Sequence, residues 1–136
     1  MSKPTGQELV DKASECKGDR YIFGVEVDLN NPNPTAEDCS ELVEWACYQL
    51  GVYPKVPDGS WNQREHCLEI SVEDAATTPG ALLFHPGHVA ISTGDGKHTI
   101  EAMGRKYGVL NGNIGDRFDS GGLIPGVDYG SNWEDV

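Results

Sequence analysis

The hydrophobic period of the sequence changes near its middle, and this change limits the folds open to the chain. Over residues 38–50, apolar side chains recur at i, i+3, i+4, i+7 and i+11, which is the spacing of one face of a helix. Residues 88–93 and 98–103 instead alternate between apolar and polar side chains around Asp95-Gly96, as the two strands of a β-hairpin do. Helices followed by an antiparallel sheet predict an α+β fold.

The remaining elements are predicted from turn and capping signals. Thr5 and Glu8 form a capping-box pattern that begins a helix over residues 5–17, and Gly51 is placed to end the helix over 38–50. Residues 24–37 and 53–80 are expected to be irregular, apart from a short helix near 62–67. Short strands are expected at 81–85, 107–110 and 122–124. A length of 136 residues predicts a single domain over residues 1–136.

Charge and composition exclude several classes of partner. The net charge is −12, and the ten Lys and Arg residues are scattered along the chain, which argues against binding to nucleic acid or to an anionic membrane. No window approaches the roughly 18 apolar residues of a membrane span, and the N-terminus has no apolar signal-peptide core. Four cysteines without a C-x-x-C pair predict neither a disulfide scaffold nor a zinc site. No metal or organic cofactor is expected.

Cys39 is the strongest candidate for a reactive side chain. It is predicted at the first turn of a helix, after a polar loop, with Asp38 as the N-cap. Free N–H groups and the positive end of the helix dipole favour the thiolate form of a cysteine at such a position. The alternative is a small core residue on the apolar helix face, which is also the expected role of Cys16 and Cys47.

A nucleophilic thiolate needs an imidazole partner, and the hairpin register indicates which histidine can serve. If Asp95-Gly96 is a two-residue turn, Ile91 faces Ile100 and Ala90 faces Glu101. His88 and Glu101 then share one face as diagonal neighbours, whereas His98 lies on the opposite, apolar face. A three-residue turn would invert this assignment. The alternative is an exposed polar face on which His88 and Glu101 have no catalytic role.

Several segments, taken together, resemble the NlpC-type cell-wall cysteine peptidases. Residues 38–43, Asp-Cys-Ser-Glu-Leu-Val, are similar to the D-C-S-x-L-V nucleophile motif of that family. The other matching segments lie in the family's order over about residues 5–110 and comprise Arg20–Gly24 (Y-x-x-G), Gln63, Pro79–Phe84 (P-G-D-L-x-F), Gly87–Ile91 (H-V-x-I) and Ile100–Ala102. Three positions depart from the pattern: Val25 follows Gly24, Ala81 replaces an Asp, and Glu101 stands where many members have His. Residues 111–136 match no part of the family pattern.

The resemblance implies a circularly permuted papain-like fold, with N-terminal helices packed on an antiparallel sheet. It also implies a cysteine endopeptidase that cleaves peptidoglycan stem peptides, commonly between D-γ-glutamate and a diamino acid. Cys39 would be the nucleophile, His88 the general acid and base, and Glu101 the residue that orients His88. Tyr21 and the backbone N–H of Cys39 would stabilise the oxyanion, and the remaining oxyanion or substrate candidates are Ser40, Trp61 and Gln63.

Two rival functions stay open from the sequence. One is a CHAP-type amidase, which also uses Cys, His and Glu. The other is a non-catalytic module that binds wall peptide or serves a structural role. The enzyme is expected to be a monomer that acts on the bacterial cell wall. It is expected to be a phage-tail or phage-lysis enzyme, a toxin delivered by a secretion machine, or a catalytic domain excised from a longer protein.

Overall fold

The computed structural model describes residues 2–133 of the chain. Its helices are α1 (Gly6–Ser14), α2 (Cys39–Gln49), α3 (Ser60–His66) and α4 (Val72–Ala76), followed by a 3₁₀ turn at Ser131–Trp133. Its strands are β1 (Arg20–Tyr21), β2 (Ala36–Glu37), β3 (Leu68–Ile70), β4 (Leu82–His85), β5 (His88–Ser92), β6 (His98–Ala102), β7 (Val109–Asn113) and β8 (Ser120–Leu123). No helix among these residues is both long enough and apolar enough to cross a membrane.

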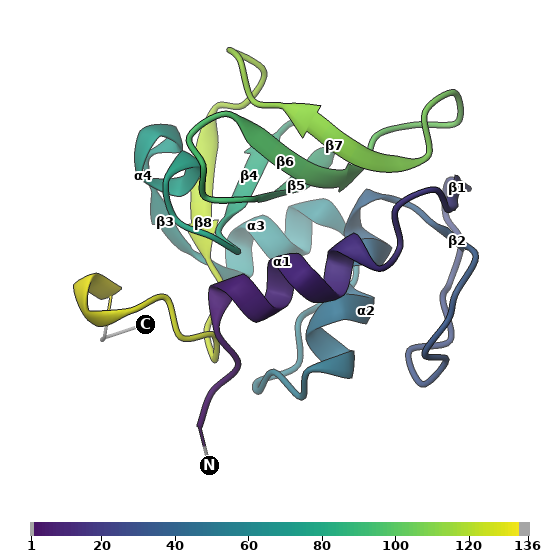
Figure 1. Ribbon diagram of the computed structural model, residues 1–136, viewed down its shortest axis with the longest axis horizontal. Helices are drawn as coiled ribbons and strands as arrows, with labels where there is room; N and C mark the ends of the chain where they lie inside the picture. The colour runs from purple at the N-terminus through teal and green to yellow at the C-terminus, as the bar shows by residue number, and fades with distance from the viewer. Residues whose placement is uncertain (1, 134–136) are drawn as a thin grey trace.

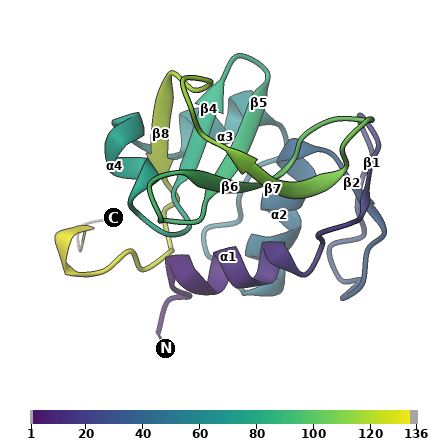
Figure 2. The ribbon, with the colours of Figure 1, turned by 45° about the horizontal axis from the view of Figure 1, so that its top comes forward.

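One six-stranded antiparallel sheet organises the molecule. Its strand order is β3-β8-β4-β5-β6-β7, while β1 and β2 form a separate parallel pair. Helices α1 and α2 pack beneath the central strands, and α4 lies beside β3 and β8 (Figures 1 and 2). This arrangement confirms the predicted α+β class, with helices packed on an antiparallel sheet.

Alternating side chains of the sheet supply two cores. Phe84, Val89, Ile91 and Ile100 pack against α1 and α2 in the larger core. Side chains on the opposite face form a smaller core with α4 and with the segment that follows β7; its members are Ala75, Ala76, Ala81, Leu83, Ala90, Ile114, Phe118 and Leu123. The strand face that carries His88 and Glu101 is therefore covered, which is not the exposed polar face of the alternative interpretation.

The two long helices begin where the capping residues predict. Thr5 and Glu8 form the reciprocal capping box of α1, and the Asp38 side chain accepts from the Glu41 N–H at 2.9 Å to cap α2. Gly51 follows α2 with φ +75°, a left-handed conformation that suits glycine best. Helix α1 ends at Ser14, three residues before the predicted end. Beyond Ser14, the backbone N–H groups of Glu15 and Cys16 bond to carbonyls three residues earlier, as in a 3₁₀ turn.

The β5–β6 register is the predicted one, although the turn is different. Ile91 pairs with Ile100 and Ser92 pairs with Thr99. Residues 94–97 form a four-residue loop in which Asp95 Oδ1 accepts from the N–H groups of Lys97 and His98, each at 2.8 Å. A loop longer by two residues preserves the parity of the strands, so the expected two-residue turn is wrong while the assignment of faces survives.

Residues 53–80 are more regular than predicted. They contain β3 and α4 besides α3, and residues 24–37 end in β2. The elements that were not predicted, β2, β3 and α4, have two, three and five residues. Such lengths are too short to show a hydrophobic period. Strand β8 contains Gly121 and Gly122 because a Cβ there would lie 2.6 Å from the Ala75 Cβ and 2.7 Å from the Cys67 Cβ, respectively. Strand propensity disfavours glycine, so it could not predict a strand whose glycines are required by close packing against distant residues.

Candidate active site

The N-terminus of α2 presents Cys39 at its first position. The capping carboxylate of Asp38 also accepts from the Ser40 hydroxyl at 3.2 Å and, through Oδ2, from the Gly24 N–H at 3.1 Å. This last bond ties the loop after β1 to the start of the helix. The N–H groups of the first helical turn have no partner within the helix itself, so an electropositive backbone lies beside the Cys39 thiol.

His88, the first residue of β5, joins Cys39 to a buried carboxylate. Its Nε2 lies 2.9 Å from Glu101 Oε1, which leaves Nδ1 for the Cys39 thiol. Burial opposes a charge on the ring, but the side-chain hydrogen bonds with Cys39 and Glu101 outweigh that effect and raise the pKa of His88 to about 9. The imidazole is therefore held as an imidazolium at neutral pH.

Glu101 receives more hydrogen bonds than any other carboxylate near Cys39. The side chain is fully buried, and it accepts from His88, from the Thr99 hydroxyl and twice from Arg117, at 2.6 and 3.1 Å. Burial alone would raise its pKa, yet these donors, His88 first and Arg117 next, hold the pKa of Glu101 at about 2. A carboxylate that stays ionised in this way can orient an imidazolium and stabilise its charge.

Three residues outside the predicted set surround the His88 ring. His85 stacks on it with centroids 4.9 Å apart, and Phe118 lies parallel to it at 6.4 Å. The Arg117 guanidinium covers the Phe118 ring at 4.7 Å and donates to the Asn113 carbonyl at 2.6 Å. Arg117 and Phe118 belong to the segment without family resemblance, and no local pattern marks them. Such an arginine could have been sought only by assuming that Glu101 is buried and needs a cationic partner.

A cleft of about 390 Å³ opens beside Cys39. Tyr21, Ser40 and Trp61 line it together with Phe23, which the sequence did not single out. Phe23 and Trp61 are exposed to 83% and 57%, so two large aromatic faces are available to a ligand. The charged side chains of the lining are all acidic: Glu26, Asp38 and Asp58.

The predicted oxyanion and substrate residues separate into two groups. Tyr21, Ser40 and Trp61 face the cleft, and burial with the nearby Cys39 and Asp38 raises the pKa of Tyr21, so its phenol remains a proton donor. Gln63 is instead buried behind the cleft, where its Nε2 donates to the carbonyls of Ser40 and Pro57, each at 3.0 Å. It supports the start of α2 from below and does not line the cleft.

Other histidine, tryptophan and cysteine side chains lie away from the cleft. The His98 ring contacts Asp95 at 2.6 Å in the hairpin loop. Trp45 is fully buried and donates to the Asn31 carbonyl at 2.8 Å. All four cysteines are free thiols. Within residues 2–133, two groups of side chains have metal-ligand geometry, Cys16–Asp19–Glu37 and Glu41–Glu44–Asp58, and neither contains Cys39, His88 or Glu101.

Solved structures of known proteins show the same fold. The NlpC/p60 domain of the peptidoglycan hydrolase SagA matches with a TM-score of 0.73 and 25% identity, over 88% of this chain and 99% of that one. The P60 domain of antigen MAP1204 from M. avium subspecies paratuberculosis matches with a TM-score of 0.73 and 22% identity, over 91% and 96% of the two chains. The peptidoglycan hydrolase RipB from Mycobacterium tuberculosis matches with a TM-score of 0.71 and 20% identity, over 88% and 64%.

No family model and no curated protein matches the sequence, so the relationship is carried by the fold together with the motifs. The shared fold is the papain-like arrangement that the motifs implied, and it spans the SagA domain almost completely. The resemblance inferred from the sequence is thereby confirmed at the level of the fold: this chain has the fold of the NlpC/p60 domains.

Proposed function

We propose that this protein is a cysteine peptidase that hydrolyses an amide bond in the stem peptide of peptidoglycan. The proposal depends on one arrangement of side chains. The Cys39 thiol lies at a helix N-terminus, within reach of the His88 imidazolium. The buried Glu101, which accepts four hydrogen bonds, keeps that imidazolium in place. A module that only binds wall peptide has no need of this arrangement, which disfavours the non-catalytic alternative.

The chemistry follows from the positions of these groups. The Cys39 thiolate attacks the scissile carbonyl carbon, and the Cys39 N–H and Tyr21 hydroxyl donate to the oxyanion. His88 transfers its proton to the leaving amine, which departs and leaves an acyl-thioester on Cys39. His88 then takes a proton from water, the resulting hydroxide attacks the thioester, and the product acid and the thiolate form.

The cleft favours a substrate with a protonated amine. Its charged lining consists of Glu26, Asp38 and Asp58, which attract an ammonium group and repel carboxylates. A diamino acid on the leaving side of the scissile bond supplies such an ammonium group, and SagA and RipB are described as peptidoglycan hydrolases. Both points support cleavage between D-γ-glutamate and a diamino acid, with the ammonium group of the diamino acid at the acidic lining and the glutamate carboxylate directed away from it. The enzyme is proposed to act on the bacterial wall as a monomer.

Digestion of purified peptidoglycan tests the proposal. The soluble products are identified by mass spectrometry, and a new N-terminal diamino acid is expected. Release of peptides with an N-terminal L-alanine would instead identify a CHAP-type amidase, which cuts between the sugar and the peptide. No release of any fragment by folded protein would favour the binding or structural module.

A matched pair of cysteine variants tests the nucleophile. Cys39→Ala should lower the rate at least about 1,000-fold with the fold retained, since alanine is a good helix former. Cys47→Ala removes a buried thiol from the same helix and should lower thermal stability while the rate stays within a few-fold of wild type. Wild-type turnover by Cys39→Ala would exclude this residue as the nucleophile.

A further inference from the structure

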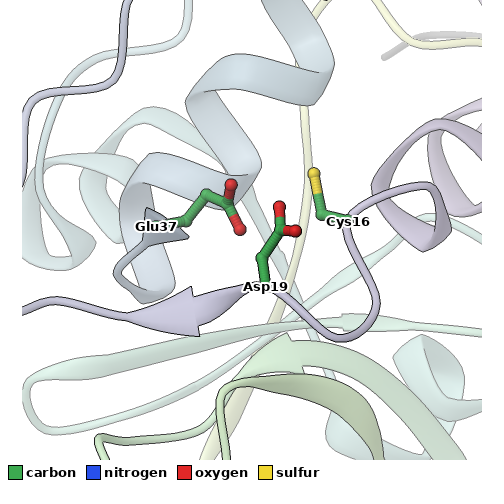
Figure 3. A group of neighbouring side chains, drawn as sticks. All are labelled: Cys16, Asp19 and Glu37. Carbon is green, nitrogen blue, oxygen red and sulfur yellow. The ribbon is translucent and has the colours of Figure 1, made fainter. Parts of the chain in front are cut away.

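A second group of reactive side chains lies outside the cleft. Cys16 and Asp19 come from the segment after α1, and Glu37 comes from β2, directly before the Asp38 cap of α2. Figure 3 shows the three side chains pointing toward one another, and their Sγ and carboxylate oxygen atoms all lie within 4.8 Å of each other. The three residues are called the Cys16–Asp19–Glu37 cluster below.

The cluster is buried and its carboxylates lack partners. Cys16 is 2% exposed and Glu37 is 0% exposed. Neither carboxylate oxygen of Glu37, nor Oδ2 of Asp19, has a hydrogen-bond partner among residues 2–133. Buried anionic groups without a partner are strongly destabilising, and they are found in proteins when a proton or a cation neutralises them.

We propose that the Cys16–Asp19–Glu37 cluster binds one divalent transition-metal ion of the zinc class. One thiolate and two carboxylates suit Zn²⁺, which accepts sulfur and oxygen ligands, whereas an all-oxygen set would favour Ca²⁺ or Mg²⁺. Ligand atoms around tetrahedral zinc lie roughly 3.2–3.8 Å apart, so small side-chain rotations close the cluster on an ion. Binding releases both the Cys16 thiol proton and the proton held by the Glu37 carboxyl to solvent, and a water molecule completes the four-coordinate shell.

The position of the cluster gives the ion a structural role. Glu37 pairs with Tyr21 across the β1–β2 ladder. A bound ion therefore ties the segment after α1 to the strand that leads into Cys39. Once its concentration exceeds the Kd, it stabilises the folded chain by an amount that grows with the logarithm of that concentration.

Cobalt substitution tests the site independently of any enzymatic activity. Chelator-treated protein is titrated with Co²⁺, and the thiolate-to-cobalt charge-transfer absorption and the stoichiometry by native mass spectrometry are measured. One ion per chain is expected, displaced by Zn²⁺. The Cys39–His88–Glu101 set also combines a thiol with an imidazole and a carboxylate, so the titration is repeated on Cys39→Ala, in which the absorption should persist.

Variants of the cluster complete the test. Cys16→Ala should lose the charge-transfer absorption, and Zn²⁺ should raise the Tm of wild type and of Cys39→Ala but not of Cys16→Ala. Glu37→Gln keeps the side-chain shape and should weaken Zn²⁺ binding at least about tenfold. If Cys16→Ala fails to fold, Glu37→Gln and Cys39→Ala still decide the assignment.

Two results would overturn the proposal. One is the absence of a thiolate–cobalt absorption in folded wild-type protein at excess Co²⁺. The other is an absorption that disappears in Cys39→Ala and survives in Glu37→Gln at wild-type affinity. Either result would mean that a proton, rather than an ion, neutralises the cluster, as expected of a carboxyl whose pKa burial and the adjacent Asp19 raise to about 9.

Discussion

Glu101 and Glu37 are both fully buried glutamates close to the candidate active site. Glu101 contacts His88, and Glu37 precedes Cys39 by two positions. Their surroundings, however, are opposite. Glu101 accepts hydrogen bonds from His88, Thr99 and Arg117. Glu37 has no hydrogen-bond donor among residues 2–133 and faces another carboxylate, Asp19. The pKa of Glu101 falls to about 2 through its donors, against the effect of burial, whereas burial first and Asp19 second raise the pKa of Glu37 to about 9.

The difference teaches that burial alone does not determine the charge of a carboxyl group. Desolvation raises the pKa of both groups, and the outcome depends on how many donors face the oxygens. The charge of Glu101 is therefore permanently available to an imidazolium. The same charge on Glu37 requires a proton or a cation, so one glutamate supports chemistry and the other offers a binding site.

The largest effect is expected from neutralising the ionised member of the pair. Glu101→Gln keeps the side-chain shape but removes the charge that stabilises the His88 imidazolium. The rate of peptidoglycan cleavage should fall about 10–1,000-fold. The variant is compared with His98→Ala, which changes a histidine on the opposite strand face and should leave the rate within a few-fold.

The ratio of the two specific activities decides which residue orients His88. A greater loss in His98→Ala than in Glu101→Gln would contradict the assignment and give the third role to His98. Glu101→His should retain part of the activity, because many NlpC-type peptidases, which this chain resembles, have His at the corresponding position.

The elements near Cys39 could be predicted because their signals are local. The Asp38 cap, the apolar face of α2 and the Gly51 stop lie within fourteen consecutive residues, and the β5–β6 register survived an error in loop length because both loops have an even number of residues. Those signals placed Cys39, His88 and Glu101, and the structure brings the three together. Their catalytic roles, and the extent of the domain over residues 1–136, stay predictions.

The surroundings of the two glutamates could not be predicted, for a physical reason in each case. Arg117 reaches Glu101 across sixteen positions from a segment without periodicity, so no pattern links them. Glu37 is brought to Cys16 and Asp19 by the pairing of β1 with β2. These strands have two residues each and are too short to show an alternating pattern. Sequence reasoning therefore treated Cys16 as a core thiol and overlooked Glu37 entirely.

The pH dependence of cleavage tests whether the charge on Glu101 acts through His88. The pKa of His88 is raised from 6.5 to about 9, so the imidazolium and its stabilising contribution are fully present below pH 6.5 and are lost as the pH rises through 9. We expect kcat/KM to fall about tenfold per pH unit above pH 9. In Glu101→Gln this alkaline limb should move to lower pH, and a limb that does not move would show that Glu101 leaves the titration of His88 unaffected.

Removing a hydrogen-bond donor from Glu101 should raise the pKa of its carboxyl group toward that of Glu37. Arg117→Met keeps an unbranched side chain at this position but removes the guanidinium, which makes two hydrogen bonds to Glu101 and covers the Phe118 ring. The rate should fall about 3–10-fold. The pKa of Glu101 should also rise. In wild type, the stability that this carboxylate contributes is fully present above pH 4.5 and is lost as the pH falls from 4.5 to about 2. This contribution should be smaller in Arg117→Met.

Arg64→Met is the matched control for that variant. Arg64 also pairs with a carboxylate, Asp119, at 2.6 Å, but half of the Asp119 side chain is exposed. Such surface pairs contribute little, so the rate and the acid stability should stay near those of wild type. Equal effects of the two substitutions would mean that Arg117 acts only as a general surface charge.

The smallest effect is a change of thermal stability that should have opposite signs for the two glutamates. The raised pKa of Glu37 means that folding takes up a proton between pH 4.5 and about 9. The stability contributed by this carboxyl is therefore fully present below pH 4.5 and is lost as the pH rises toward 9. In metal-free protein at pH 8, Glu37→Gln removes this decline, and its amide donates to the unpartnered Oδ2 of Asp19. The Tm should rise by about 3–5 °C. Glu101→Gln should lower the Tm under the same conditions, because it leaves the Arg117 guanidinium without its carboxylate. Differential scanning calorimetry with EDTA measures both shifts. A lower Tm for Glu37→Gln would mean that the carboxyl of Glu37 has a stabilising partner, and the contrast between the two glutamates would then not hold.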